Sequence, residues 1–291
     1  MNVLITGSHG LVGSALVSLL SPSYEVLTPL RAEMDLLRKE TITTYLSLHR
    51  PNAIILAAAY VNAGAAENER GDTNGVCYQT NVLGTKYIVE SGEELGIPTV
   101  YISTGSVFHG TDEHPGPFAE DAHPESDPEK NNWYGYTKYL GEMSHPSAII
   151  RISHPIIPET LRIKEDYLHK ILRLYENHTL HPLFPDQLFP VTSITDLAES
   201  IRIIIEKKHT GVFHAASPDL VSPYELTLHF LEQLGKPIDD RIKKMSIEDF
   251  YALGNSPLRF SKYSALSPEQ TMERLPYTFK SWKESMSQYN K

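Results

Sequence analysis

The first thirteen residues combine a short apolar strand, a glycine-rich turn and the start of a helix. The run Val3-Leu4-Ile5 has no polar alternation, which is typical of a strand buried on both faces of a parallel sheet. Gly7, Gly10 and Gly13 follow at once, and residues 11–20 carry apolar residues at helical spacing. Glycine lets the backbone turn sharply beside a pyrophosphate, and the free N–H groups of a helix N-terminus favour that anion. This order predicts a dinucleotide-binding fold; the alternative is a plain turn between a strand and a helix.

Strand and helix patterns then alternate over the first half of the chain. We expect further strands at residues 25–28, 53–59, 99–103 and 148–152, and helices at residues 40–50, 73–95 and 133–143. Because such alternation requires crossover connections, it predicts an α/β protein with a doubly wound parallel sheet, the Rossmann arrangement.

After residue 153, prolines divide the chain into shorter elements. Helices are expected at residues 165–177, 194–207, 223–234, 247–253 and 277–289, and a strand at residues 211–215. We therefore predict a dinucleotide-binding Rossmann domain over residues 1–153. Residues 154–291 would form mainly a smaller substrate-binding lobe, with some segments returning to the Rossmann sheet.

The net charge and the cysteine and histidine content limit the kinds of molecule that the chain is expected to bind. A formal charge of −10 argues against binding to nucleic acid or an anionic membrane through a global positive field. One cysteine, Cys77, excludes an intramolecular disulfide and a cysteine-rich zinc site, and the 13 histidines are too scattered to predict a metal site. Met1 leads directly into the first strand, and no apolar run approaches the ~18 residues of a membrane span, so a cytoplasmic protein is expected.

Three side chains are candidates for catalysis at the carboxyl edge of the sheet. Thr104 follows the strand at residues 99–103, and Tyr134 and Lys138 lie four apart on one face of the next helix. An ammonium about 4 Å from a phenol interacts by about 4 kcal/mol at an effective dielectric constant of 20. We expect Lys138 to lower the pKa of Tyr134 by about two to three units. The alternative is an amphipathic helix face with a snorkelling lysine.

In these residues the chain resembles the extended short-chain dehydrogenase/reductase superfamily. The resemblance rests on the glycine spacing, Asp35-Leu36, Ala57-Ala58-Ala59, Asn81, Ser103-Thr104 and Tyr134-Gly135-Tyr136-Thr137-Lys138. Within the superfamily the chain is most similar to the dTDP-4-dehydrorhamnose reductase branch, through residues 103–108, 133–138 and 151–154.

The resemblance implies roles for individual residues. Tyr134 would be the general acid, Lys138 would lower its pKa and bind the nicotinamide ribose, and Thr104 would be the third catalytic hydroxyl. Asn81 would brace the sheet or approach the site. The implied cofactor-binding residues are Gly7, His9, Gly10, Leu11, Val12, Gly13, Arg31, Asp35, Leu36, Ala57, Ala58, Ala59, Ser103, Tyr134, Lys138, Ser153 and His154. The implied substrate-binding residues are Ser106, Val107, Phe108, Trp133 and Arg259.

Two positions depart from the branch pattern. Gly105 stands where the branch usually has aspartate, and Ser256-Pro257-Leu258-Arg259 is the nearest match to a motif that usually has Arg-Pro. Arg259 is our candidate for the pyrophosphate-binding arginine, with a plain surface arginine as the alternative.

The loop after the second expected strand bears on the choice of cofactor. An acidic residue there would hydrogen-bond the ribose of NAD, but the chain has Thr28-Pro29-Leu30-Arg31. A guanidinium at Arg31 suits a 2′-phosphate, so NADP(H) is favoured and NAD(H) is the alternative.

Three functions follow as hypotheses. The first is a reductase of a nucleotide-linked 4-keto-6-deoxysugar. The second is an epimerase or epimerase-reductase resembling GDP-fucose synthase, although Ser106 replaces the reactive cysteine of that family. The third is a non-catalytic NADP-binding regulatory subunit. The superfamily resemblance also suggests a homodimer formed through the helices near residues 73–95 and 133–143.

Overall fold

The computed structural model describes residues 1–254, 259 and 261–289 and contains a six-stranded parallel sheet in the order β2-β1-β3-β4-β5-β8. Its strands are β1 (Asn2–Thr6), β2 (Glu25–Leu27), β3 (Ala53–Leu56), β4 (Thr99–Thr104), β5 (Ala148–Ile152) and β8 (Gly211–Ala215). The order reverses at β1, which has β2 on one side and β3 on the other. Ligands of doubly wound sheets bind at such a reversal, outside the carboxyl ends of the strands.

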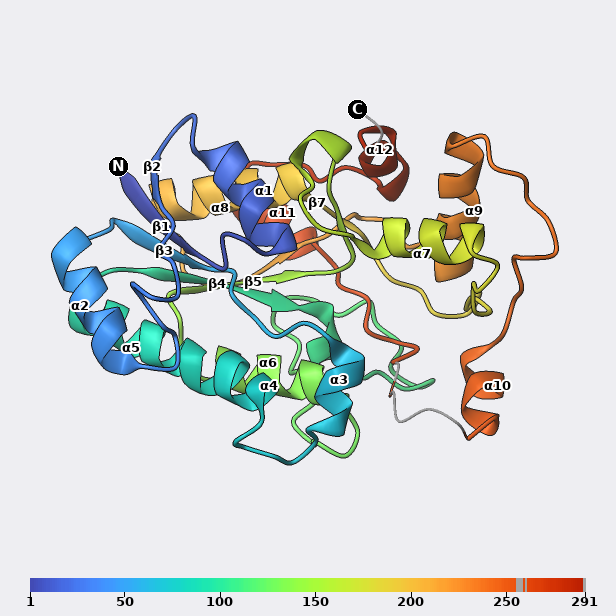
Figure 1. Cartoon of the computed structure of the whole chain (residues 1–291), viewed down its shortest axis with the longest axis horizontal. Helices are drawn as coiled ribbons and strands as arrows, with labels where there is room; N and C mark the ends of the chain where they lie inside the picture. Colours follow the sequence, from blue (N-terminus) through green and yellow to red (C-terminus); the bar gives the residue numbers. More distant parts are fainter. Residues whose placement is uncertain (255–258, 260, 290–291) are drawn as a thin grey trace.

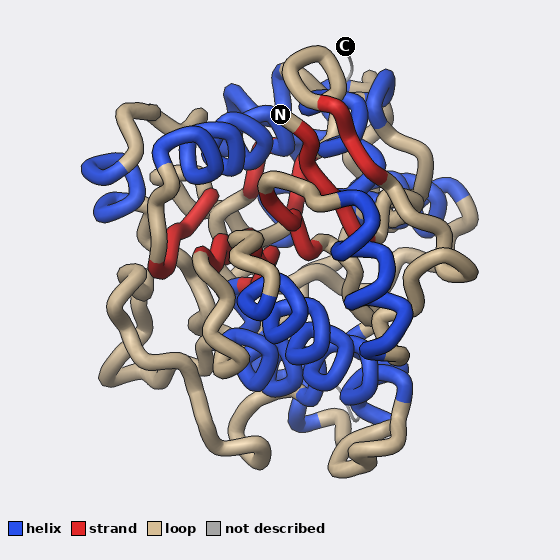
Figure 2. The backbone as a smooth tube through the Cα atoms, turned by 90° about the vertical axis from the view of Figure 1, so that its left-hand side faces the viewer, coloured by secondary structure: helices blue, strands red, loops and turns tan. Residues whose placement is uncertain are grey.

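Helices cover both faces of the sheet (Figure 1). On one face lie α1 (Leu11–Leu20) and α8 (Ile194–Lys207); on the other lie α2 (Lys39–His49), α5 (Thr85–Glu94) and α6 (Trp133–Glu142). Figure 2 shows the strands between these two helical layers. The predicted doubly wound α/β fold is confirmed.

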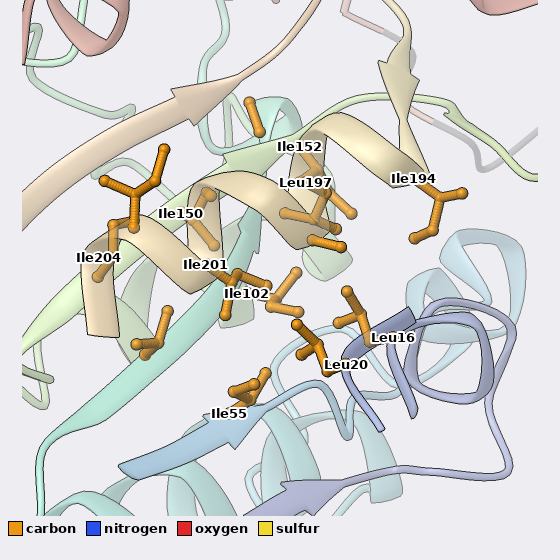
Figure 3. Packing of buried hydrophobic residues seen from close by; sticks show 14 of the residues in the cluster. Leu16, Leu20, Ile55, Ile102, Ile150, Ile152, Ile194, Leu197, Ile201 and Ile204 are labelled. Carbon is orange, nitrogen blue, oxygen red and sulfur yellow. The ribbon is translucent and has the colours of Figure 1, made fainter. Parts of the chain in front are cut away.

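Successive residues of β1 enter two different cores. Val3 and Ile5 join the cluster beneath α1 and α8, whose leucines and isoleucines are drawn in Figure 3, while Leu4 joins the cluster beneath α2 and α5. All three side chains are buried. Burial on both faces explains why the strand is apolar without alternation.

The segment predicted as one helix over residues 73–95 is divided. It contains α4 (Val76–Tyr78), a π-helical turn η1 (Gln79–Gly84) and α5. The loop before it also holds a short helix, α3 (Ala63–Asn68), which begins where Asn62 accepts a hydrogen bond from Ala65 N at 3.1 Å. A π-helical turn is rare and is frequently found at functional sites.

The second half of the chain contributes to both the main sheet and a smaller layer. β8 pairs with β5, and α8 packs against α1. The smaller layer contains the strands β6 (Pro155–Ile156) and β7 (Thr192–Ser193) and the helices α7 (Tyr167–Glu176), α9 (Pro223–Gln233), α10 (Ile247–Ala252) and α12 (Trp282–Ser287). The helix α11 (Glu269–Arg274) packs against β8 of the main sheet instead. Short 3₁₀ turns occur at Gly105–Val107 (η2) and Glu159–Leu161 (η3). The domain boundary at residue 153 stays a prediction.

The helix predicted over residues 277–289 is shorter than expected, and the sequence pattern missed α11. Ser281 starts α12 with a capping box, in which its hydroxyl accepts from Glu284 N and the Glu284 carboxylate accepts from Ser281 N. Across the described residues, every helix is too short or too polar to cross a membrane.

Candidate active site

The glycine turn is packed against the loop that follows β3. Gly7 has φ +66°, and a Cβ there would lie 2.7 Å from the Cα and N atoms of Ala58. A Cβ on Gly13 would lie 2.2 Å from the carbonyl oxygen of Gly7. Ala58 N also donates to Thr6 Oγ1 at 3.2 Å. The glycines are therefore required for this turn, which brings Ala57–Ala59 beside the helix N-terminus.

The N-terminus of α1 offers backbone donors to an anion. Its N-cap residue is Gly10, which has no side chain to cap the helix. The first intrahelical bond is donated by Ser14 N to Gly10 O at 3.0 Å, so the N–H groups of residues 11–13 precede it. His9 is exposed beside them, with Nδ1 3.2 Å from Ser8 Oγ. The glycine turn and these N–H groups, at residues 7–13, form a cradle that side chains larger than glycine would fill. This cradle fits the pyrophosphate of a dinucleotide.

Arg31, Asp35 and Leu36 lie beyond β2. The Arg31 side chain is 77% exposed, and its Nε donates to Asp35 Oδ2 at 3.3 Å. Such exposed pairs contribute less than about 1 kcal/mol, so the guanidinium can turn to another anion. Asp35 Oδ1 also accepts from Leu37 N at 3.1 Å, while Leu36 packs against the cluster beneath α2.

The Thr104 and Tyr134 hydroxyls meet at the carboxyl end of β4. Asn132 starts α6 by accepting from Gly135 N at 2.7 Å, which places Tyr134 in the first turn. Gly135 lies against η2, because a Cβ there would be 2.0 Å from Ser106 O. Thr104 Oγ1 accepts from Ser106 N at 3.1 Å, and the Thr104 side chain is hydrogen-bonded to the Tyr134 phenol.

The acidity of Tyr134 differs from the sequence expectation. Burial raises the pKa of Tyr134 to about 12, opposed by the hydrogen bond from Thr104. The predicted lowering of this pKa by Lys138 is therefore corrected, because burial of the phenol dominates. The phenol is fully protonated at neutral pH, which is the form a proton donor needs.

Lys138 is held by β4. Its side chain is buried, Nζ donates to Ile102 O at 2.7 Å, and it lies 4.0 Å from the centre of the Tyr101 ring. Burial lowers the pKa of Lys138 to about 7, and the nearby Glu142 carboxylate opposes this effect. The Lys138 ammonium therefore hydrogen-bonds the Ile102 carbonyl of β4, whereas the sequence analysis predicted that it would lie beside the Tyr134 phenol.

Asn81 in the π-helical turn braces the site. Its Oδ1 accepts from Tyr60 N at 2.8 Å, and its Nδ2 donates to Tyr60 O at 3.0 Å and to Thr137 Oγ1 at 3.1 Å. These bonds join the loop after β3 to α6. The bracing role expected for Asn81 agrees with this geometry.

Ser103, Ser153 and His154 were also expected to contact the cofactor. Ser103 is buried, and its Oγ donates to Glu142 Oε1 at 2.6 Å. Ser153 Oγ lies 3.0 Å from His154 Nδ1, and the imidazole stacks on Phe189 at 3.6 Å between ring centres. Burial lowers the pKa of His154 to about 4, so its ring is neutral at pH 7.

Three predicted substrate residues are core residues instead. Val107 and Phe108 are 0% and 1% exposed, because η2 turns them inward against Leu266 and Phe118. Trp133 is buried and stacks on Tyr136 with ring centres 5.6 Å apart. Their burial does not support direct substrate contact, which stays a prediction for these side chains. Ser106 is half-buried between Thr104 and Gly135.

A pocket of about 470 Å³ lies between the loop after η2 and the C-terminal half. Its charged and aromatic lining residues are His109, Asp112, Lys130, Arg259, Lys262, Tyr251 and Tyr263. Arg259 also bonds the Glu129 backbone carbonyl and lies 3.5 Å from its carboxylate. The motif residues Ser256, Pro257 and Leu258 lie outside the described residues. The sequence analysis missed Lys130 and Lys262, which lie far apart in the sequence, so no local pattern indicates them.

Sequence analysis also missed a buried ion pair behind the site. Arg151 and Glu142 bond at 2.7 Å beneath β4. An arginine within the apolar strand at residues 148–152 was the available signal.

Among the residues that the structure describes, no group of His, Cys, Asp or Glu could hold a metal ion.

A glycine cradle at the strand reversal, with a tyrosine, a lysine and a threonine at the adjoining strand ends, defines a protein of the extended short-chain dehydrogenase/reductase class. Within it, the chain belongs to the RmlD substrate binding domain family, whose sequence profile matches residues 1–291.

Individual relatives agree with this family. The chain is 27% identical over 224 residues to a dTDP-4-dehydrorhamnose reductase of Sinorhizobium fredii, covering 74% of this chain and 72% of the relative. It is 50% identical over 62 residues to a GDP-L-colitose synthase of Yersinia pseudotuberculosis, covering 21% and 20%. Its fold matches a crystal structure of dTDP-4-dehydrorhamnose reductase from Bacillus anthracis in complex with NADP, with a TM-score of 0.86, 23% identity and coverage of 99% and 98%.

Proposed function

We propose that this protein is an NADPH-dependent reductase of a nucleotide-linked 4-keto-6-deoxysugar. The observation that carries the proposal is the pairing of the Thr104 and Tyr134 hydroxyls next to the glycine cradle. This pairing supports a proton donor at the same sheet edge as the cradle proposed for the dinucleotide. The names of the relatives support this substrate class.

Gly7, Gly13 and the N-terminus of α1 would hold the cofactor phosphates, and its nicotinamide would supply the hydride when bound. Tyr134 would donate its proton to the carbonyl oxygen as the hydride reaches the carbon, which leaves an alcohol and a phenolate. The Thr104 hydroxyl would orient the phenol, because it is hydrogen-bonded to Tyr134 and its oxygen is held by Ser106 N.

Lys138 would stabilise the phenolate through its positive charge and bind the ribose. The ammonium has one strong acceptor, Ile102 O, and two further N–H groups. A raised pKa keeps Tyr134 protonated before the reaction, whereas the ammonium favours the anion formed during it. The pair therefore combines a stable proton donor with a partner for the charge that develops.

The cationic pocket would receive the substrate phosphates. Lys130, Arg259 and Lys262 line it, and Lys130 lies four residues before Tyr134 in the chain. Nucleotide-linked sugars carry a diphosphate, for which arginine and lysine are suitable partners.

Arg31→Ala is expected to weaken NADPH binding about tenfold and leave NADH binding nearly unchanged, because only NADPH carries the 2′-phosphate. Fluorescence titration with both cofactors measures this. Arg173→Ala is a matched control, since Arg173 is also exposed and paired with a carboxylate, at 2.7 Å from Glu165. Equal losses for both cofactors would remove Arg31 from the 2′-phosphate site. Failure of the wild type to bind either cofactor would overturn the oxidoreductase proposal.

The reductase proposal itself is tested by NADPH oxidation with a panel of dTDP-, GDP- and UDP-linked 4-keto-6-deoxysugars, with product analysis by NMR. We expect one nucleotide class to support turnover. Cofactor binding without turnover across the panel would instead favour a regulatory protein.

A second candidate is an epimerase-reductase of a GDP-linked sugar. It is favoured by the 62-residue match to GDP-L-colitose synthase. Epimerisation next to a carbonyl exchanges ring protons with solvent, whereas reduction alone does not. Incubation with a GDP-linked 4-keto sugar in D₂O without NADPH would therefore incorporate deuterium only if the second candidate is correct.

A further inference from the structure

A fully bonded charge cluster lies behind the Tyr134–Lys138 face. Glu142 ends α6, Arg151 lies in β5, and their side chains are 5% and 3% exposed. Glu142 Oε1 accepts from Ser103 Oγ at 2.6 Å and from Arg151 Nε at 3.0 Å, and Oε2 accepts from Arg151 Nη2 at 2.7 Å. The carboxylate is therefore held in one orientation by three bonds.

His214 completes the cluster from β8. Its Nδ1 lies 2.8 Å from Ser267 O and must carry the proton, because a carbonyl oxygen only accepts. Its Nε2 can then accept from Arg151 Nη1 at 3.3 Å. Burial and the Arg151 charge lower the pKa of His214 to about 3, so the imidazole is neutral. Arg151 and Glu142 are therefore the two charged members of the cluster.

Stability alone does not account for such a pair. Replacing a buried ion pair by apolar residues of similar volume is often neutral or stabilising, because desolvation offsets the attraction. The cluster is instead notable because its residues adjoin the candidate catalytic residues in the chain. Ser103 directly precedes Thr104, and Glu142 lies four residues after Lys138 and eight after Tyr134, so all three residues of α6 share one face.

The charge of Glu142 acts on Lys138. The side chains that act on the Lys138 ammonium are the Glu142 carboxylate on α6, the Cys77 thiol on α4 and the Tyr101 ring on β4. Of these, Glu142 is the largest influence that raises the pKa of Lys138 against burial. Arg151 in turn binds both oxygens of the buried Glu142 carboxylate and holds it in place.

We propose that Glu142 is a positioning residue for the reaction: clamped between Ser103 and Arg151, it fixes α6 against β4 and holds its negative charge on the face of α6 that carries Lys138. The inference rests on the proposed function only in assigning Lys138 to catalysis. The contacts of Glu142 are independent of that assignment.

Glu142→Gln tests the proposal. It keeps the side-chain shape but removes the charge, so Lys138 should lose its proton at lower pH. Because activity requires the ammonium, the alkaline limb of kcat/KM should move down by about one pH unit. Asp196→Asn is the matched control: Asp196 is a buried carboxylate on α8, across the sheet, bonded to Tyr277 and Lys280. It should lower Tm without moving this limb.

A second readout needs no turnover. Lysine labelled with ¹³C at Cε reports the titration of Lys138 by NMR in the protein without cofactor, with Lys138→Gln to assign the signal. A shift of this titration in Glu142→Gln, in a protein that turns over no substrate, would support the inference while the proposed function fails.

An unchanged titration and an unchanged alkaline limb would overturn the inference, even if kcat fell. If Glu142→Gln does not fold, Glu142→Gln/Arg151→Met removes both charges and avoids a lone buried cation. A smaller downward shift is expected in the double variant, because loss of the Arg151 charge partly offsets loss of the Glu142 charge. An unshifted or raised Lys138 titration there would overturn the proposal.

Discussion

Tyr134→Phe is expected to lower kcat by at least ~10²-fold while cofactor affinity changes little, because a general acid contributes ~10² to 10⁴ in rate. The substitution removes one hydroxyl and keeps the ring. It leaves the glycine cradle and the N-terminus of α1 untouched, so NADPH should still bind. Steady-state kinetics with the active keto-sugar nucleotide, together with a fluorescence titration of NADPH, separate these two effects.

Tyr136→Phe provides the matched control for Tyr134→Phe. Tyr136 lies two residues further along α6, where its ring stacks on Trp133. Removal of its hydroxyl keeps that packing and should leave kcat within about twofold, as expected for a change outside the reacting groups. Wild-type turnover in Tyr134→Phe would exclude Tyr134 as the proton donor.

The sheet and its glycine turn could be predicted from sequence because both depend on local patterns. Residues 3–5 are apolar throughout since both faces of β1 are covered, and the glycine spacing follows from close backbone contacts. The strand at 211–215 and the helix at 194–207 were predicted with the bounds that the structure gives them. Elements defined by their own periodicity are thus recoverable from one chain.

The interior of the site depends on contacts between distant segments. The π-helical turn in residues 79–84 accompanies the bonds of Asn81 to Tyr60 and Thr137, which helical periodicity cannot indicate. Similarly, the spacing of Tyr134 and Lys138 placed them on one face of α6. It could not show that Ile102 O, on a different element, would take the ammonium.

The burial of residues 107–108 also depends on contacts between segments that are distant in the sequence. An apolar pair after a strand can line a ligand site or enter the core, and the sequence does not distinguish the two. The 3₁₀ turn at Gly105–Val107 and the approach of Leu266 decide the outcome. The burial of this apolar pair could therefore not be predicted from its local pattern.

Gly13→Ala is expected to weaken NADPH and NADH binding by about 100-fold. The new Cβ would lie 2.2 Å from Gly7 O, so α1 must move away from the glycine turn. Alanine gains about 1 kcal/mol of helix propensity over glycine, but overpacking of this kind costs about 1–3 kcal/mol. Displaced N–H donors can no longer meet the pyrophosphate, and each 1.4 kcal/mol lost is about tenfold in affinity.

Ser18→Ala is the control for Gly13→Ala because it adds alanine to the same helix at an exposed position. It should bind both cofactors like the wild type, with equal or slightly higher Tm. Fluorescence titration and thermal unfolding of the two variants separate helix propensity from the steric effect. Both cofactors should weaken together in Gly13→Ala, since both carry the pyrophosphate, in contrast to the NADPH-selective effect expected at Arg31. Wild-type affinity in Gly13→Ala would show that the cofactor phosphates bind elsewhere than at the N-terminus of α1.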